Sequence, residues 1–154
     1  MGSLYLSAYQ SYLWNRLLDH SLRELFGPSQ LGAIRLDVGD FAVPVSGTPE
    51  QVAAWQEWWL PLLSARLKVS TPAIDAVLAA EGLTLATLRV PGIPKPFFSK
   101  GERAACLRPD RVTTAIEDDE LNRGRQKLLL TFELPRGCYA TMLVKRITSV
   151  LPPT

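Results

Sequence analysis

A proline- and glycine-rich stretch, residues 89–109, most limits what this chain can fold into. It reads RVPGIPKPFFSKGERAACLRP and holds four prolines and two glycines. Proline lacks a backbone donor and both residue types interrupt regular structure, so a long helix or a central strand is not expected here. We therefore expect this stretch to be a connection between two modules, one on each side of it.

The residues before this connection predict a long helix and a hairpin. Apolar residues recur every three or four positions over residues 4–27, which is typical of an amphipathic helix that ends at Gly27-Pro28. Apolar residues then alternate on both sides of Gly39-Asp40, which predicts two strands joined at that turn. Pro44 cannot donate a hydrogen bond to a neighbouring strand, so the second strand is expected at a sheet edge.

Two further helices are predicted by a shared start signal, a threonine followed by a proline. The signal occurs at Thr48-Pro49 and again at Thr71-Pro72, where the hydroxyl caps the first turn and proline takes the first helical position. Gln51 completes a capping box with Thr48. We expect the first helix to bend or end at Pro61 and the second to stop at Gly82.

Three tryptophans cluster in the first of these two helices. Trp55 and Trp59 are four residues apart, so they share one face, and Trp58 lies beside them. A face buried in the core is the favoured interpretation. The alternatives are a surface on which nucleotide bases stack and an exposed patch for a partner protein.

The residues after the connection predict strands at 112–116 and 127–134, joined by the polar segment EDDELNRGRQ, and a final helix at 139–150. Leu129 is apolar on the face opposite its apolar neighbours, so the second strand is expected to be partly buried on both faces. The acidic run at 117–120 lacks the spacing of a calcium loop and is interpreted as a solvated turn. The whole pattern predicts an α+β fold.

Several kinds of chemistry find no support in the residues. His20 is the one histidine, Cys106 and Cys138 are the two cysteines, and together they form no recognisable zinc or Cys–His pattern. No phosphate-binding or dinucleotide-binding fingerprint is present, so neither a metal nor a cofactor is expected. Widely spaced cysteines fit a reducing compartment. With no secretory signal and no run of 18 apolar residues, we expect a cytoplasmic location and no membrane contact.

The charges are unevenly distributed along the chain. Residues 1–94 carry 6 Lys/Arg and 8 Asp/Glu, whereas residues 95–154 carry 11 and 7. A basic last third is compatible with contact to phosphates, although an ordinary solvated surface explains it equally well.

Three stretches carry a resemblance to a known family. They are LSAYQSYLWNRLL at 6–18, GERAACLRP at 101–109 and FELPRGCYATMLVKRI at 132–147. In this order they are similar to motifs of the TruD family of tRNA pseudouridine synthases, and Gly39-Asp40 also has a counterpart there. The matching residues are Ser7, Ala8, Ser11, Leu13 and Asn15 in the first stretch, and Phe132, Leu134, Pro135, Gly137, Tyr139, Ala140 and Thr141 in the third.

The resemblance implies a division into domains and an activity. Residues 1–107 would form most of the family's inserted domain, and residues 108–154 the last antiparallel strands and helix of its catalytic sheet. The activity implied is the isomerisation of a tRNA uridine, at position 13, to pseudouridine without a cofactor. The full-length enzyme would be a cytoplasmic monomer with tRNA as its partner.

The resemblance also implies site residues. Gly137 would let the backbone approach the target nucleotide closely, and Tyr139 and Thr141 would line the pocket that encloses it. The residues expected to contact RNA or the catalytic aspartate are Arg103, Arg108 and Lys145. A core position for Tyr139 and a solvated loop position for Arg108 are equally open alternatives.

The chain departs from the family at two points. The family's nucleophile is an aspartate in a Gly-x-Lys-Asp motif, and none of the seven aspartates here follows Gly-x-Lys. The family's Arg-Glu pair is Lys145-Arg146 in this chain, which reverses the charge at the second position. We therefore expect a C-terminal fragment that is inactive alone, half of a split enzyme, or a relative that only binds RNA.

Overall fold

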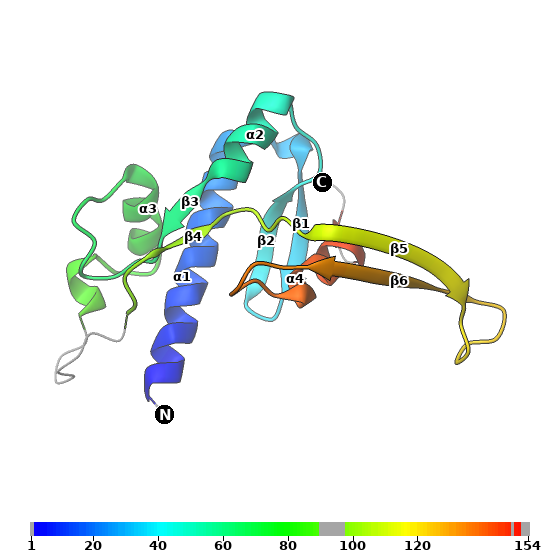
Figure 1. The fold of residues 1–154 in the computed structure, drawn as a ribbon. Helices are drawn as coiled ribbons and strands as arrows, with labels where there is room; N and C mark the ends of the chain where they lie inside the picture. Colours follow the sequence, from blue (N-terminus) through cyan, green and yellow to red (C-terminus); the bar gives the residue numbers. More distant parts are fainter. Residues whose placement is uncertain (1, 90–97, 149, 152–154) are drawn as a thin grey trace. The chain divides into compact units, whose positions relative to one another are not determined.

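The computed structural model describes residues 2–89, 98–148 and 150–151, and it confirms the α+β class (Figure 1). The chain divides into two compact units. The first holds residues 1–106 together with 145–154, and the second holds residues 107–144, so the division falls inside the last helix. Three of the twelve prolines, Pro91, Pro94 and Pro96, lie in the connection but outside the described residues.

The first unit is built on the helix α1, Gly2–Leu25. One stretch of its apolar face, with Leu13 and Leu17, joins a buried cluster that also contains Leu63 and Leu78. Further along, Leu22 joins a second cluster with three other buried residues, Phe26, Leu31 and Ala42. Burial of each large side chain stabilises the fold by about 1.5–3 kcal/mol. Because α1 contributes buried side chains to both clusters, it is the element that the two clusters share.

A three-stranded sheet follows α1 and a short 3₁₀ turn, Pro28–Gln30. Strands β1, Leu31–Leu36, and β2, Gly39–Pro44, pair antiparallel, and β7, Val150–Leu151, pairs with the other edge of β1. The expected edge position of β2 is confirmed for the described residues. The C-terminal strand β7 was not expected, because the predicted helix extended to residue 150.

The hairpin turn lies two residues earlier than the sequence suggested. Leu36 pairs with Gly39, so the loop is Asp37-Val38 and not Gly39-Asp40. In this register Ile34 lies opposite Phe41, and both side chains are buried. A strand shifted by one residue would turn its buried side chains to the other face, so this burial fixes the register.

The next helix starts as expected and ends early. In α2, Pro49–Glu57, Thr48 Oγ1 accepts from the Gln51 backbone N–H at 3.3 Å, and Gln51 Oε1 accepts from the Thr48 N–H at 2.9 Å, which confirms the capping box. The expectation of a helix reaching Pro61 was wrong. Trp59–Pro61 form strand β3, which pairs antiparallel with β4, Glu102–Ala104.

The core interpretation of the tryptophans was also wrong for one of them. Because Trp59 lies in β3 and not in α2, it does not share a helical face with Trp55, and 62% of its surface is exposed. Trp55 is half-buried and meets Phe26 edge to face, with ring centroids 6.3 Å apart. The three rings therefore form neither a common core face nor a common exposed patch.

Helix α3, Pro72–Ala80, has the expected limits. Thr71 Oγ1 accepts from the Ile74 N–H at 3.4 Å, and Gly82 takes a left-handed conformation with φ +68° just beyond the helix. A second 3₁₀ turn, Ala86–Leu88, follows. Its Leu88 and the α3 residue Leu78 complete the first buried cluster.

A buried glutamine ties α1 to two distant loops. Gln10 is 4% exposed, and its Nε2 donates to the carbonyl oxygens of Leu63 at 3.0 Å and Ser99 at 2.8 Å. Its Oε1 accepts from the Ser99 backbone N–H at 3.0 Å. The amide thus pairs the buried carbonyl of Leu63 and both backbone groups of Ser99.

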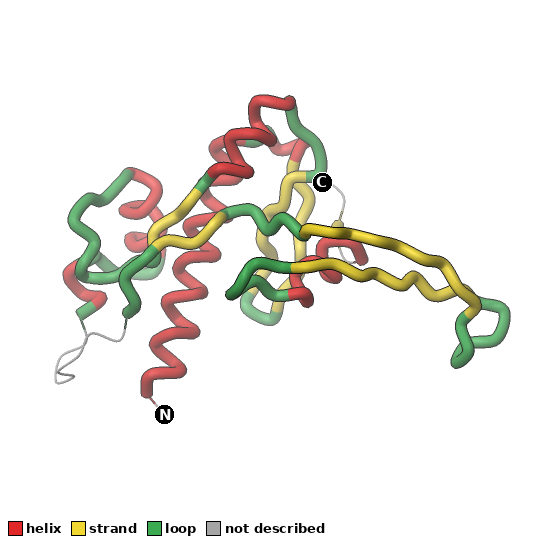
Figure 2. The backbone as a smooth tube through the Cα atoms, viewed as in Figure 1, coloured by secondary structure: helices red, strands yellow, loops and turns green. Residues whose placement is uncertain are grey.

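The second unit is a long antiparallel hairpin and the start of a helix (Figure 2). Strands β5, Asp110–Asp118, and β6, Gln126–Glu133, pair with an irregularity after Asp110. The expectation that β6 is partly buried on both faces is met on one of them, where Leu130 and Phe132 are half-buried, whereas Leu129 on the opposite face is exposed. Helix α4, Ala140–Thr148, ends two residues before the predicted limit because the chain then joins β1.

Replacing Gln10 with alanine should lower the free energy of unfolding by about 2–3 kcal/mol, because the carbonyl of Leu63 loses its buried donor. Urea unfolding followed by circular dichroism measures this. Gln56→Ala, at a half-buried position of α2, is the matched control and should change stability by less than about 0.5 kcal/mol. Equal effects of the two substitutions would contradict this role of Gln10.

Candidate functional site

The candidate site begins where β6 ends and α4 starts. The Cys138 N–H donates to the Pro135 carbonyl oxygen at 3.1 Å, which closes a four-residue turn. Gly137, the third residue of this turn, has φ +85°. A positive φ at that position is typical of a type II turn and favours glycine. The local sequence Pro-Arg-Gly therefore specifies the turn that redirects the chain from strand to helix.

The turn places two candidate pocket residues at an exposed surface. Tyr139 is 70% exposed, so the alternative of a core aromatic is wrong for this chain. The Tyr139 carbonyl oxygen accepts from the Met142 N–H at 3.0 Å, which starts the first turn of α4. Thr141 is exposed one residue into that helix. An aromatic ring and a hydroxyl next to a tight backbone turn can enclose and orient a planar base.

The other candidate residues are distributed over both units. Arg108 is exposed in the second unit, just before β5. Arg103 and Lys145 belong to the first unit. The Arg103 guanidinium lies 5.6 Å from the ring centroid of the buried Trp14, so it makes a cation–π contact within the fold. Lys145 is half-buried on α4.

Arg146, the residue that departs from the family motif, has a structural partner. Its Nη2 donates to the carbonyl oxygen of Pro44, the last residue of β2. Both residues belong to the first unit. The arginine therefore holds the end of α4 to the edge strand, which an acidic residue at this position could not do because it has no N–H to donate.

The tip of the β5–β6 hairpin is the feature that sequence analysis underrated. One carboxylate, that of Asp119, accepts from the backbone N–H groups of Leu121 at 2.9 Å and Asn122 at 3.1 Å, and from Asn122 Nδ2 at 2.8 Å. The Asn122 amide, followed by the Leu121 N–H, lowers the pKa of Asp119. The Asp-x-x-Asn spacing before a glycine was the sequence signal for this ordered loop.

Some features are absent from the described residues. No group of three or more His, Cys, Asp or Glu side chains there is arranged to hold a metal ion. In the same residues, no helix is long and apolar enough to cross a membrane. Cys106 and Cys138 form no disulfide.

Comparison with known proteins identifies the family. Residues 64–147 match the family model described as tRNA pseudouridine synthase D (TruD). The chain is 27% identical over 149 residues to the "Probable tRNA pseudouridine synthase D 2" of Methanocaldococcus jannaschii, covering 95% of this chain and 35% of that protein. It is 29% identical over 155 residues to the "Probable tRNA pseudouridine synthase D 1" of Methanococcus maripaludis, covering 98% and 39%.

A bacterial relative matches in the same way. The "tRNA pseudouridine synthase D" of Aquifex aeolicus is 27% identical over 148 residues, which cover 94% of this chain and 36% of that protein. The chain thus has the sequence of a TruD-type protein over most of its length, and it belongs to the TruD family. It spans little more than a third of the length of these relatives.

Replacing Gly137 with alanine should lower stability by about 1 kcal/mol, because an L side chain is strained at φ +85° although nothing lies within 4 Å of the added Cβ atom. Gly137→Asn should cost less, since asparagine tolerates the left-handed region. Thermal unfolding of both variants measures the difference. Equal losses for alanine and asparagine would show that the turn conformation is not the cause.

Replacing Arg146 with glutamate, the family's residue, should lower the free energy of unfolding by about 1–3 kcal/mol, because a carboxylate would face the Pro44 carbonyl. Arg146→Gln keeps an N–H donor and should lose less. Chemical denaturation of the two variants tests this order. A glutamate variant as stable as the original chain would exclude the proposed clamp between α4 and β2.

Proposed function

We propose that this chain is the C-terminal portion of a TruD-type tRNA pseudouridine synthase. The family match and the names of the relatives support tRNA as the substrate class. The position of the target uridine, 13, rests on the resemblance of the motifs. Residues 1–107 would form most of the inserted domain and residues 108–154 the end of the catalytic domain.

The reaction is an isomerisation that needs no external oxidant or reductant. The bond between ribose C1′ and uracil N1 breaks, the base rotates, and a bond forms between C1′ and C5. The proton lost from C5 is balanced by one gained at N1. The base must leave its stack before this happens, and a partly aromatic pocket offsets part of that cost.

The observation that carries the proposal is the exposed apolar surface of the hairpin unit. Val112, Ile116, Leu128 and Leu129 are exposed on its two strands, and both outer strand edges lack a partner among the described residues of this unit. Strands with unpaired edges and exposed apolar side chains tend to pair with further strands. The chain spans 35–39% of its two archaeal relatives, so the remaining family sequence is the natural source of those strands and of the catalytic aspartate.

The roles of the candidate residues follow from this placement. Tyr139 and Thr141 would line the wall of the pocket, and Gly137 would let the turn approach the nucleotide. Arg108 would contact the RNA from its position just before β5. Arg103 and Lys145 would contact RNA or the catalytic aspartate, in addition to the packing contact that Arg103 makes with Trp14.

A second candidate function is that of an RNA-binding module without catalysis. The observation that favours it is an arginine at 146 in place of the family's glutamate. This module would bind tRNA in a salt-sensitive manner and would form no pseudouridine even when the remaining family sequence is supplied. In both functions we propose a cytoplasmic protein, and for the complete enzyme a monomer.

The decisive test begins with the DNA upstream of the Met1 codon, read in frame. The complete product of that frame should convert uridine to pseudouridine in an unmodified tRNA transcript, detected by carbodiimide labelling and primer extension. The 154-residue chain alone should not. Conversion by the chain alone would contradict the fragment hypothesis, and binding without conversion by the complete product would favour the second function.

In the complete product, Tyr139→Ala should lower kcat/KM by about tenfold to a hundredfold, a loss typical of removing a positioning group, while Tyr139→Phe keeps most of the activity. Tyr5→Ala is the matched control, because Tyr5 is 73% exposed on α1. Single-turnover rates with the tRNA transcript measure the effect. Similar rates for the Tyr139 and Tyr5 variants would remove Tyr139 from the pocket.

A further inference from the structure

The two faces of the β5–β6 hairpin differ in their chemistry. Ala115 pairs with Leu129, and the next residue along, Ile116, pairs with Leu128. Successive side chains of a strand point to opposite faces, so these two pairs lie on different faces of the hairpin. The apolar face holds Ile116 and Leu128 together with Thr114, Leu130 and Phe132. The polar face holds Ala115 and Leu129 together with Thr113, Glu117, Lys127 and Thr131.

The apolar face leaves large side chains uncovered in this chain. Ile116 is 67% exposed and Leu128 is 52% exposed, although they lie directly opposite each other. Leu130 and Phe132 are only half-buried, and no residue of this face carries a charge. A sheet face of this composition is normally buried against a second layer of structure. The apolar face is therefore a surface that lacks its covering layer here.

The polar face suits contact with water. Glu117 and Lys127 lie directly opposite each other, and Lys127 Nζ is 3.6 Å from Glu117 Oε2. Opposite charges in such a cross-strand pair attract each other while they remain solvated. Leu129 is the one large apolar side chain of this face. The hairpin thus has the pattern of an antiparallel sheet that is buried on one side and solvated on the other.

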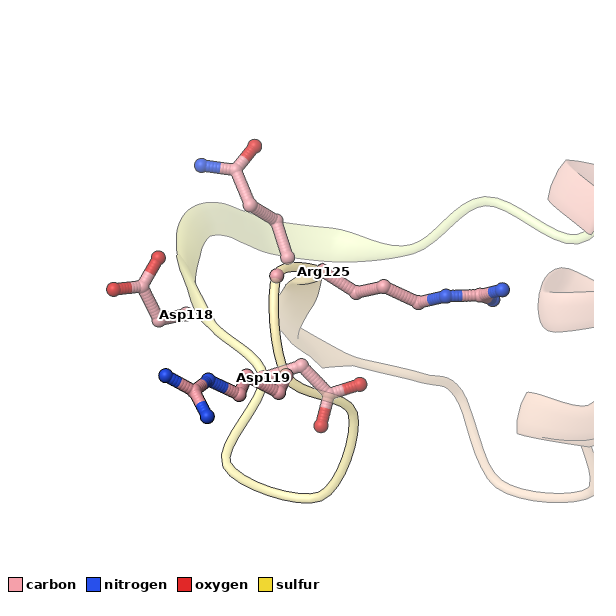
Figure 3. Close-up of a pocket in the computed structure, with 6 residues that line it drawn as sticks. Asp118, Asp119 and Arg125 are labelled. Atoms are coloured by element: carbon pink, nitrogen blue, oxygen red, sulfur yellow. The ribbon is translucent and has the colours of Figure 1, made fainter.

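The apolar face ends before the tip of the hairpin. Beyond Ile116 and Leu128 lies the pair Asp118 and Gln126, and the loop that follows is charged. Its concavity is lined by acidic and basic residues together, including Asp118, Asp119 and Arg125. Figure 3 shows the guanidinium of Arg125 extending away from Asp118. Mixed charges pointing in different directions favour water at the tip, so the covering layer is needed only over the strands.

We propose that the apolar face of the β5–β6 hairpin packs against apolar side chains from the remaining sequence of a TruD protein, which form a second layer over it. This inference rests on the proposed function, in which the chain is a C-terminal portion. The chain spans 35% and 39% of two archaeal relatives, so the sequence that would supply this layer is present in them. Strand pairing at the hairpin edges would leave this face bare, so the layer is a separate contact.

RNA and a second copy of the chain fit this face less well. Binding to RNA depends on cations that neutralise phosphates, and the apolar face has no cation. A stable interface between two separate proteins uses about 20–30 residues on each side, far more than this face offers. A layer from the same polypeptide avoids the entropic cost of association, so a small apolar surface is sufficient for it.

The test is the reactivity of single cysteines placed on the hairpin. The rate of maleimide labelling is read for each peptide by mass spectrometry, which separates the substituted position from Cys106 and Cys138. The proteins compared are the 154-residue chain and the complete product of the upstream frame. Ile116→Cys and Leu128→Cys should each react at least about tenfold more slowly in the complete product, because a packed layer admits the reagent only during local opening.

The matched controls are the adjacent residues of the polar face. Ala115→Cys and Leu129→Cys should react at similar rates in the two proteins, because that face stays in water. Added tRNA should leave the rates of all four variants unchanged. Circular dichroism spectra of the variants should overlay with that of the parent protein.

Equal rates in the two proteins for both Ile116→Cys and Leu128→Cys overturn the inference. Pseudouridine formation by the complete product would still support the proposed function in that case. Equal slowing on both faces contradicts a layer on one side. Slowing that requires tRNA assigns the face to RNA, and slowing in the 154-residue chain that grows with its concentration assigns it to a second copy. A stop codon directly upstream of Met1 overturns this inference together with the fragment hypothesis.

Discussion

The first unit depends on the burial of one helical face. Apolar residues of α1 enter two separate clusters, Leu13 and Leu17 in one and Leu22 in the other. Polar contacts from the same helix then fix what packs against it. Asp19 Oδ1 accepts from the Ala42 N–H at 2.6 Å, which aligns β2, and the amide of Gln10 ties the loops at Leu63 and Ser99. An isolated helix is only marginally stable in water. The helix α1 therefore depends on these contacts, just as the strand and loops that make them depend on α1.

The hairpin unit has no comparable helix face to cover it. Its stability within this chain comes from strand pairing and from the closed loop at its tip. Four large apolar side chains of its strands are exposed, namely Val112, Ile116, Leu128 and Leu129. A two-stranded hairpin is marginally stable alone. The contrast between the two units is the physical basis for proposing that further strands, from the rest of a TruD protein, complete the second.

Charge counts along the chain were a poor guide to where an anion would bind. The basic last third includes cations already engaged within the fold: Arg103 over Trp14, Arg111 with Glu133, and Lys127 with two glutamates. Arg146 holds β2 by a hydrogen bond. Subtracting these internal contacts leaves a smaller set of cations for any contact with phosphates.

The sequence by itself determined the elements whose signals are local. Periodicity predicted α1, and the threonine-proline caps predicted the starts of α2 and α3, because each of these signals acts within a few residues. The motifs also led to the TruD family. Only the tertiary structure decided the pairing of β3 with β4 and of β1 with β7, the exposure of Trp59, and the hairpin register. Those features depend on residues far away in the sequence. Long-range burial and strand pairing determine them, and no local sequence pattern predicts either one.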